Sequence, residues 1–239
     1  SPFAYFGFNA STGQLEWTAR FDQSDYPWAN FFAYMPQTAG YGQIFVLSYA
    51  GVYGVNATNG NIEWKFTPGF SGMETPYNSW PFGSTGAVVG GGLVFAPSTE
   101  HTPQLYYRGT RMYGIDALTG EGVWNITGYY TPTAVAYGTL IATDVPNGGT
   151  YAFSKGETQT TVMTSSKIAA KGAPLLIEGT VMDLSPAQPN TPAISDEYMT
   201  PWMEYLHMQQ PKPTDATGVQ VKLTAVDQNG RSVDLGTTT

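Results

Sequence analysis

Acid–base and metal-binding chemistry needs histidine, cysteine or grouped carboxylates, and this chain offers few of them. It has two histidines and no cysteine. Glu100 and His101 are adjacent and could form an acid–base pair or bind a metal ion. Neighbouring residues of an extended chain point in opposite directions, so we favour a structural or exposed role for His101. His207 follows an apolar helical stripe and is expected near a helix C-terminus, where its charge suits the helix dipole.

The carboxylates show no spacing that marks a metal site or a catalytic pair. Asp22 and Asp25 fall in an aromatic loop, and Glu74 precedes a Thr-Pro pair. This spacing does not match a Ca²⁺-binding loop, so we expect solvated loop carboxylates. The sequence also has no nucleophile motif, phosphate-binding loop or dinucleotide fingerprint. We therefore predict no catalytic residue, no cofactor, no metal ion and no enzyme activity.

The composition predicts short strands joined by tight turns. The 239 residues include 28 glycines and 17 prolines, and 14% of them are aromatic, which suits half-buried pleated surfaces. The formal net charge is −8 and no Lys/Arg cluster stands out, so nucleic acid and anionic membranes are poor partner hypotheses. Without cysteine the chain has no disulfide. No apolar run is long enough to span a bilayer.

A repeated eleven-residue pattern, G-x-[ND]-A-x-[TN]-G-x-x-x-W, organises the first part of the chain. Its copies are Gly7–Trp17, Gly54–Trp64 and Gly114–Trp124, offset by 47 and then 60 residues. In each copy Asn or Asp caps a turn through its side chain, and the second glycine supplies a positive φ. Each copy therefore predicts a β-hairpin whose second strand ends in tryptophan.

A second periodic element precedes each hairpin. A glycine-containing turn leads into an apolar strand at Tyr41–Val46, Gly90–Phe95 and Tyr137–Ala142. Together the two elements make a meander of about four short strands in roughly 45–50 residues, a period typical of propeller blades. A degenerate fourth copy, Tyr151–Gly156, has no following tryptophan. We expect the last blade to lack its own outer strand, which an N-terminal strand supplies in closed propellers.

The repeat resembles the tryptophan-docking motif of quinoprotein-like (PQQ-type) propellers, which runs A-x-D-x-x-T-G-x-x-x-W. Here glycine replaces the first alanine three times and asparagine replaces the aspartate twice. The resemblance implies docking of each tryptophan against the neighbouring blade. The implied structural docking residues are Trp17, Trp64 and Trp124, with the turn glycines Gly13, Gly60 and Gly120.

We predict an all-β chain with two domains. Residues 1–162 are expected to form three to four blades at the C-terminal end of a longer propeller, and 163–239 an immunoglobulin-like (Ig-like) β-sandwich, incomplete at its C-terminus. Its strands are expected at Leu175–Asp183, Val219–Asp227 and from Ser232 onward. One short helix lies between them, capped by Ser195 or Thr200, with Pro201 in its first turn. Its apolar stripe packs in the core or, alternatively, binds a partner: Met199, Trp202, Met203 and Leu206.

The combination of propeller and following domain, over about residues 45–239, resembles archaeal PQQ-binding-like β-propeller surface proteins. That resemblance implies a secreted, cell-surface protein, with a membrane anchor, if any, outside this sequence. We expect the sequence to be a piece of a longer chain. Three glycosylation sequons, at Asn9, Asn56 and Asn125, permit N-linked glycan, although two coincide with turns that want Asn anyway.

Two aromatic connections and one long loop hold the candidate contacts for a ligand or partner. The aromatic rings could stack on sugars or dock a protein, or they could pack over the blade ends. The candidates are Trp28, Phe31, Tyr77, Trp80, Glu100, His101 and Arg108.

The leading functional hypothesis is an extracellular scaffold, such as an S-layer-type lattice, sheath, filament or adhesion module, whose partners are other protein subunits. Propeller surfaces and exposed strand edges would make its contacts. The alternative is a solute- or glycan-binding propeller. A PQQ-dependent dehydrogenase is the third hypothesis.

Overall fold

The computed structural model describes residues 4–21, 37–83, 85–99, 109–185 and 190–239. The chain divides into two compact units between Ser154 and Lys155. The described residues form strands apart from one short helix and one 3₁₀ turn.

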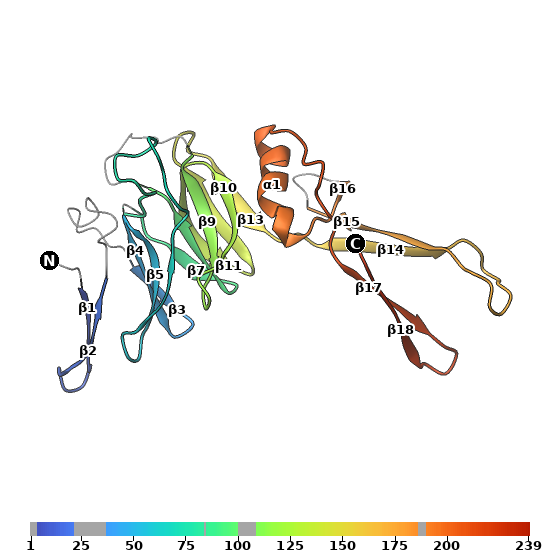
Figure 1. Cartoon of the computed structure of the whole chain (residues 1–239), viewed down its shortest axis with the longest axis horizontal. Helices are drawn as coiled ribbons and strands as arrows, with labels where there is room; N and C mark the ends of the chain where they lie inside the picture. The colour runs from blue at the N-terminus through green and yellow to red at the C-terminus, as the bar shows by residue number, and fades with distance from the viewer. Residues whose placement is uncertain (1–3, 22–36, 84, 100–108, 186–189) are drawn as a thin grey trace. The chain divides into compact units, whose positions relative to one another are not determined.

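The first unit contains four antiparallel sheets that follow one another along the chain (Figure 1). The first sheet is a hairpin of β1 (Ala4–Phe8) and β2 (Leu15–Arg20). The second has β3 (Gln37–Gly40), β4 (Gln43–Ser48), β5 (Gly51–Asn56) and β6 (Ile62–Phe66). The third has β7 (Val88–Gly90), β8 (Leu93–Pro97), β9 (Arg111–Asp116) and β10 (Gly122–Thr127). The fourth has β11 (Tyr130–Ala136), β12 (Thr139–Asp144) and β13 (Thr150–Ser154).

Each four-stranded sheet is a meander in which consecutive strands pair, as the predicted blade requires. The first hairpin of each meander closes through two residues with positive φ, Tyr41-Gly42 in the second sheet and Gly91-Gly92 in the third. Two positive φ angles in a row are the signature of a type I′ turn, whose twist matches that of the strands. Tyr137-Gly138 repeats this turn in the fourth sheet. The four sheets are called blades 1 to 4 below.

The hydrophobic core lies between successive blades. One cluster joins β4, β5 and β6 of blade 2 to β8 and β9 of blade 3, with Phe45, Trp64 and Ile115 among its members. A second cluster joins blade 1 to blade 2 through residues such as Phe21 and Tyr53. Burial of these faces against each other is the main stabilising contribution to the fold, because apolar surface of both blades is removed from water.

Blade 4 has three strands in the described structure, in line with the expected missing outer strand. The N-terminal strand does not supply it, since β1 pairs with β2 in a separate sheet. The predicted fourth copy, Tyr151–Gly156, falls largely on β13. The motif's bend instead occurs one turn earlier, between β12 and β13: the Gly148 amide donates to the Asp144 carbonyl at 2.8 Å, and Gly148 has φ 69°.

The second unit contains β14 (Thr158–Thr164), β15 (Ile177–Asp183) and β16 (Thr191–Pro192) in one sheet. A separate hairpin consists of β17 (Val221–Val226) and β18 (Ser232–Thr238). The predicted strands are thus present within two residues of their expected starts. The predicted domain boundary at 162/163 falls inside β14, however, and this strand pairs with β15 over seven residues. That pairing assigns residues 158–162 to the second unit.

The predicted helix is present as α1 (Met199–Met208), preceded by a 3₁₀ turn at Asp196–Tyr198. Trp202 is its buried residue. Neither predicted capping residue, Ser195 or Thr200, caps the helix, because no side-chain capping hydrogen bond is made. The Ser195 hydroxyl instead pairs with the Thr217 hydroxyl at 3.1 Å, and Thr200 lies inside the helix. The helix ends in Gln209, whose left-handed φ of 56° stops further turns.

The tyrosines between the blades should make the protein sensitive to alkali. Burial raises the pKa of Tyr113 to about 12, against about 10 in an unfolded chain. The unfolded state therefore loses its proton first, and the free energy of unfolding falls as the pH rises from about 10 to about 12. Denaturant titrations over this range should show a shallower loss for Tyr113→Phe than for wild type. An unchanged slope in Tyr113→Phe would contradict this, and Tyr137→Phe, on an exposed ring, is the matched control.

Candidate functional site

The repeated turn has the same geometry in all three hairpins. In the second copy the Asn56 carbonyl accepts the Gly60 amide at 2.9 Å. The Asn56 side-chain Oδ1 accepts the backbone amides of Thr58 and Asn59, at 2.9 and 3.3 Å. The first and third copies repeat these contacts around Asn9 and Asp116. The turn glycines have φ of 71°, 75° and 76°, which a residue with a Cβ resists: Gly13, Gly60 and Gly120.

Each motif tryptophan lies over the first glycine of its own hairpin. Trp64 pairs across the strands with Gly54, and a Cβ on Gly54 would overlap the indole ring. Gly7 and Trp17 make the same pair in blade 1, as do Gly114 and Trp124 in blade 3. This contact explains why glycine stands where the related motif has alanine.

Two of the three indoles also cover the turn glycine of the next blade. A Cβ added to Gly60 would lie 2.6 Å from the Trp17 ring, and one added to Gly120 would lie 2.6 Å from the Trp64 ring. The Trp64 indole Nε1 donates to the Ala117 carbonyl of blade 3 at 3.2 Å. The indole is therefore held between two glycines on two blades, and its polar N–H is satisfied.

Trp124 contacts a different partner. Its ring stacks on Phe153 of β13 with centroids 6.0 Å apart, and it also lies 5.8 Å from Phe95. Blade 4 has no outer strand in the described structure, so no motif turn follows its third strand, β13, at the place where Trp124 would be received. Phe153 takes that place.

The opposite side of each hairpin receives the preceding blade. On β5, Tyr53 and Val55 alternate with Gly54 and therefore face blade 1, where Phe21 lies 5.0 Å from the Tyr53 ring. On β9 the equivalent Tyr113 contacts Phe66 of blade 2 at 5.4 Å. These aromatic contacts are edge-on or tilted, the arrangement that ring quadrupoles favour.

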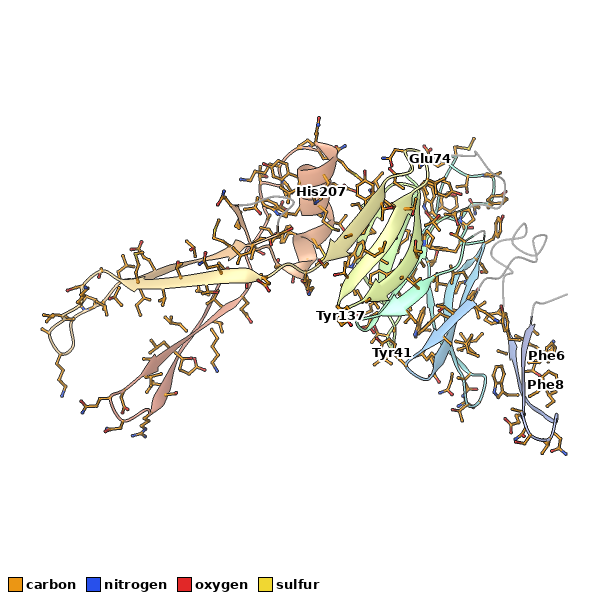
Figure 2. All side chains as sticks on the ribbon, turned by 180° about the vertical axis from the view of Figure 1, so that it is seen from behind. Phe6, Phe8, Tyr41, Glu74, Tyr137 and His207 are labelled. Atoms are coloured by element: carbon orange, nitrogen blue, oxygen red, sulfur yellow. The ribbon has the colours of Figure 1, made fainter. Side chains whose placement is uncertain are left out.

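The equivalent positions in blade 1 are Phe6 and Phe8. They are 53% and 61% exposed, whereas the four residues that match them in blades 2 and 3 are at most 6% exposed. Figure 2 shows both rings projecting from the hairpin on the side away from the other blades. We call Phe6, Phe8 and the turn glycine Gly13 the blade 1 receptor face.

The turns between the first and second strands of blades 2 and 3 make a further contact between these blades. The amide of Gly92, in blade 3, donates to the Tyr41 hydroxyl of blade 2 at 2.8 Å. Tyr137 holds the equivalent position in blade 4 and is fully exposed; both tyrosines are labelled in Figure 2. Sequence reasoning missed this contact, although a tyrosine before glycine in both turns was visible as a signal.

The aromatic connection of residues 76–82 packs over the blade ends. Tyr77 is buried and meets Tyr49 edge-on at 4.9 Å. The Ser79 hydroxyl donates to the Tyr49 carbonyl at 2.6 Å. Trp80 is half-buried and close to Gly109. The other candidate contacts, together with Asp22 and Asp25, lie outside the described residues: Trp28, Phe31, Glu100, His101 and Arg108.

The side chains of the sequon asparagines make hydrogen bonds within their own hairpins. The Asn9 Nδ2 donates to Glu16 at 2.8 Å and the Asn56 Nδ2 to Glu63 at 3.2 Å. Asn125 accepts a hydrogen bond from the Arg111 guanidinium. All three side chains are half-buried, so a glycan would have to replace or share these contacts.

The described residues contain no group of three or more His, Asp or Glu side chains placed to hold a metal ion. His207 is exposed in the last turn of α1, and Glu74 lies in a turn after Ser71, as labelled in Figure 2. In the same described part of the chain, no helix is long and apolar enough to cross a membrane.

No protein-family model and no curated protein sequence matches the chain. Its structure is similar to several solved structures at low identity. BamB from Moraxella catarrhalis is 15% identical over 62% of this chain and 46% of that chain, with a TM-score of 0.37. A europium-containing methanol dehydrogenase is 16% identical over 53% and 21%, with 0.39. A quinohemoprotein alcohol dehydrogenase from Comamonas testosteroni is 12% identical over 97% and 43%, with 0.41. The chain thus spans less than half the length of each.

A methyl group on a glycine that lies under a motif tryptophan should destabilise the protein. Gly54→Ala places a Cβ inside the Trp64 ring, so we expect a loss of about 1–3 kcal/mol in the free energy of unfolding. Gly86→Ala is the matched control, because a Cβ there meets no atom within 4 Å and its φ is not positive. Chemical denaturation measures both. Equal stability of the two variants would show that the contact between Gly54 and Trp64 imposes no packing constraint.

Of the three motif turns, the one with Asp116 should make the free energy of unfolding depend on pH in acid, because the other two have asparagine at this position. Backbone amides, that of Thr119 first and that of Leu118 after it, lower the pKa of Asp116. Its contribution is therefore present above the unfolded value of about 3.9 and is lost as the pH falls through the lowered folded pKa. In unfolding titrations from neutral to acid pH, Asp116→Asn should lose less stability than wild type. Asn56→Asp should acquire the additional acid dependence; its absence there would refute the assignment to the turn.

Proposed function

We propose that the chain is an extracellular, cell-surface scaffold of the archaeal PQQ-binding-like propeller type, which assembles with other protein subunits through its blade faces. The blade 1 receptor face supports this most directly. Phe6 and Phe8 are 53% and 61% exposed at positions that blades 2 and 3 bury. Apolar rings that are exposed at positions packed between blades elsewhere favour a contact with a further blade, of this chain or of another subunit.

Further surface in the second unit fits the same role. Every residue of β14 and of β18 is exposed, and among the described residues each of these strands pairs with one neighbour. Unpaired strand edges add strands from partners. We assign these strands to an Ig-like sandwich, because the sequence of β17 alternates with period two and β18 pairs with it as the next strand. The extracellular location rests on the family resemblance, and the sequons only permit glycosylation.

The alternative functions have less support among the described residues. Solute or glycan binding relied on the aromatic connections, but Tyr77 is buried and Trp80 is half-buried. A quinone-dependent dehydrogenase stays a third hypothesis, which dye reduction with added PQQ and Ca²⁺ would check.

Replacing the exposed aromatic rings should abolish assembly. We expect wild-type protein to self-associate or to bind partner subunits as its concentration rises, and Phe6→Ser/Phe8→Ser to stay monomeric, because the apolar area of the receptor face is lost. Sedimentation velocity over a concentration series measures this. Phe70→Ser is the matched control, since Phe70 is 73% exposed but lies outside the blade faces. Wild-type protein that is monomeric at all concentrations and binds no surface extract would overturn the proposal.

A further inference from the structure

We propose that Asn229 is a modification site, at which the side-chain amide is lost by spontaneous deamidation. It belongs to one of three Asn-Gly pairs in the chain, which are Asn59-Gly60, Asn147-Gly148 and Asn229-Gly230. Asparagine is a chemically labile residue, and a following glycine has no Cβ to obstruct attack by its backbone nitrogen. The sequence makes the three pairs alike, and the structure separates them. This site does not depend on the proposed function.

The reaction needs only the chain itself and water. The Gly230 backbone nitrogen attacks the side-chain Cγ of Asn229, so that an N–Cγ bond forms and closes a five-membered succinimide ring. The Cγ–Nδ2 bond breaks, and Nδ2 leaves as ammonia with the proton of the Gly230 amide. Water then opens the ring at either carbonyl, which gives aspartate or isoaspartate, and nothing is oxidised or reduced. Ring closure therefore requires a side chain that can rotate over the following peptide bond.

The fold restrains Asn59 on both sides of this bond. Its Oδ1 accepts the Asn61 amide at 2.9 Å, and its own amide donates to the Asn56 side chain at 3.3 Å. The Gly60 amide, which holds the attacking nitrogen, donates to the Asn56 carbonyl at 2.9 Å. Gly60 is also buried under the Trp17 ring. Ring closure at this position would break the motif turn of blade 2.

Both polar atoms of the Asn147 side chain are engaged. Its Oδ1 accepts the Gly149 amide at 2.6 Å, and its Nδ2 donates to the Tyr151 hydroxyl at 3.3 Å. The Gly148 amide donates to the Asp144 carbonyl at 2.8 Å. The side chain must give up two hydrogen bonds before it can turn toward the Gly148 nitrogen, and this opposes ring closure.

Asn229 lacks this side-chain restraint. It lies in the turn between β17 and β18, where its backbone amide donates to the Asp227 Oδ1 at 2.8 Å. The Gly230 amide donates to the Asp227 carbonyl at 3.0 Å. Among the described residues the Asn229 side chain makes no hydrogen bond, and a Cβ on Gly230 would meet no atom within 4 Å. The Asn229 amide can therefore rotate over the Gly230 nitrogen, whereas the other two must first break side-chain hydrogen bonds.

The products would alter the hairpin turn. The Asp227 Oδ1 also accepts the Arg231 amide, at 2.9 Å, and deamidation adds a second carboxylate two residues away. Isoaspartate adds a methylene group to the main chain between Val226 and Ser232, which pair across the hairpin. We expect this longer turn to disturb the register of β17 and β18.

Peptide mapping by mass spectrometry tests the site in the full chain. The protein is incubated in mildly alkaline buffer and, separately, in the same buffer with concentrated guanidinium. In native buffer Asn229 should convert at least about tenfold faster than Asn59 or Asn147, because these two react only after their turns open. In guanidinium the three rates should agree within about threefold, since the turn bonds are lost. Asn229→Gln is the matched control and should lose the fast mass gain, because a longer side chain closes a less favourable six-membered ring.

Equal rates at the three sites in native buffer would overturn the proposal, as would no conversion at Asn229 while the unfolded chain reacts. A mass gain in Asn229→Gln as fast as in wild type would contradict the assignment to this residue. A preference for Asn229 that persists unchanged in guanidinium would assign the difference to neighbouring residues and refute the role of the turn bonds.

Discussion

The stacking of blades depends on one interaction, an indole ring held between two glycines. Trp64, at the middle of the outer strand β6, lies over Gly54 opposite it and over the turn glycine Gly120 of the next blade, and Trp17 repeats this arrangement with Gly7 and Gly60. Neither glycine can carry a Cβ without meeting the ring. The Asn or Asp side chain that organises each turn places the receiving glycine, so a local bend determines a contact between blades.

The local part of this arrangement can be predicted from sequence. Asn56 and Gly60 define a turn by themselves, because side-chain capping and positive φ act within six residues. The partner of Trp124 could not be predicted, since Phe153 takes the place of the turn that follows the third strand in blades 2 and 3. The helix cap and the domain boundary failed for a similar reason: Ser195 bonds to distant Thr217, and β14 joins the sheet of β15.

The candidate site was predicted only in part. The three tryptophans and their glycines stand out because they recur in register. Phe6 and Phe8 do not stand out, since an alternating aromatic strand looks the same whether its far side is covered or exposed. Only comparison with Tyr53 and Val55 in the structure reveals the difference. Tyr77 shows the reverse case, an aromatic residue in a connection whose ring turns inward onto Tyr49.

The interface between blades is also directional. One side of a hairpin carries the tryptophan and the other side receives one, so the two surfaces are different and complementary. A two-fold axis would bring like surface against like and leave both indole and receptor unmatched. Contacts of this heterologous kind repeat only by a fixed rotation, which either closes into a ring or continues as a helical fibre. The rotation between successive blades, and not the affinity of the contact, then decides which of these two outcomes an assembly reaches.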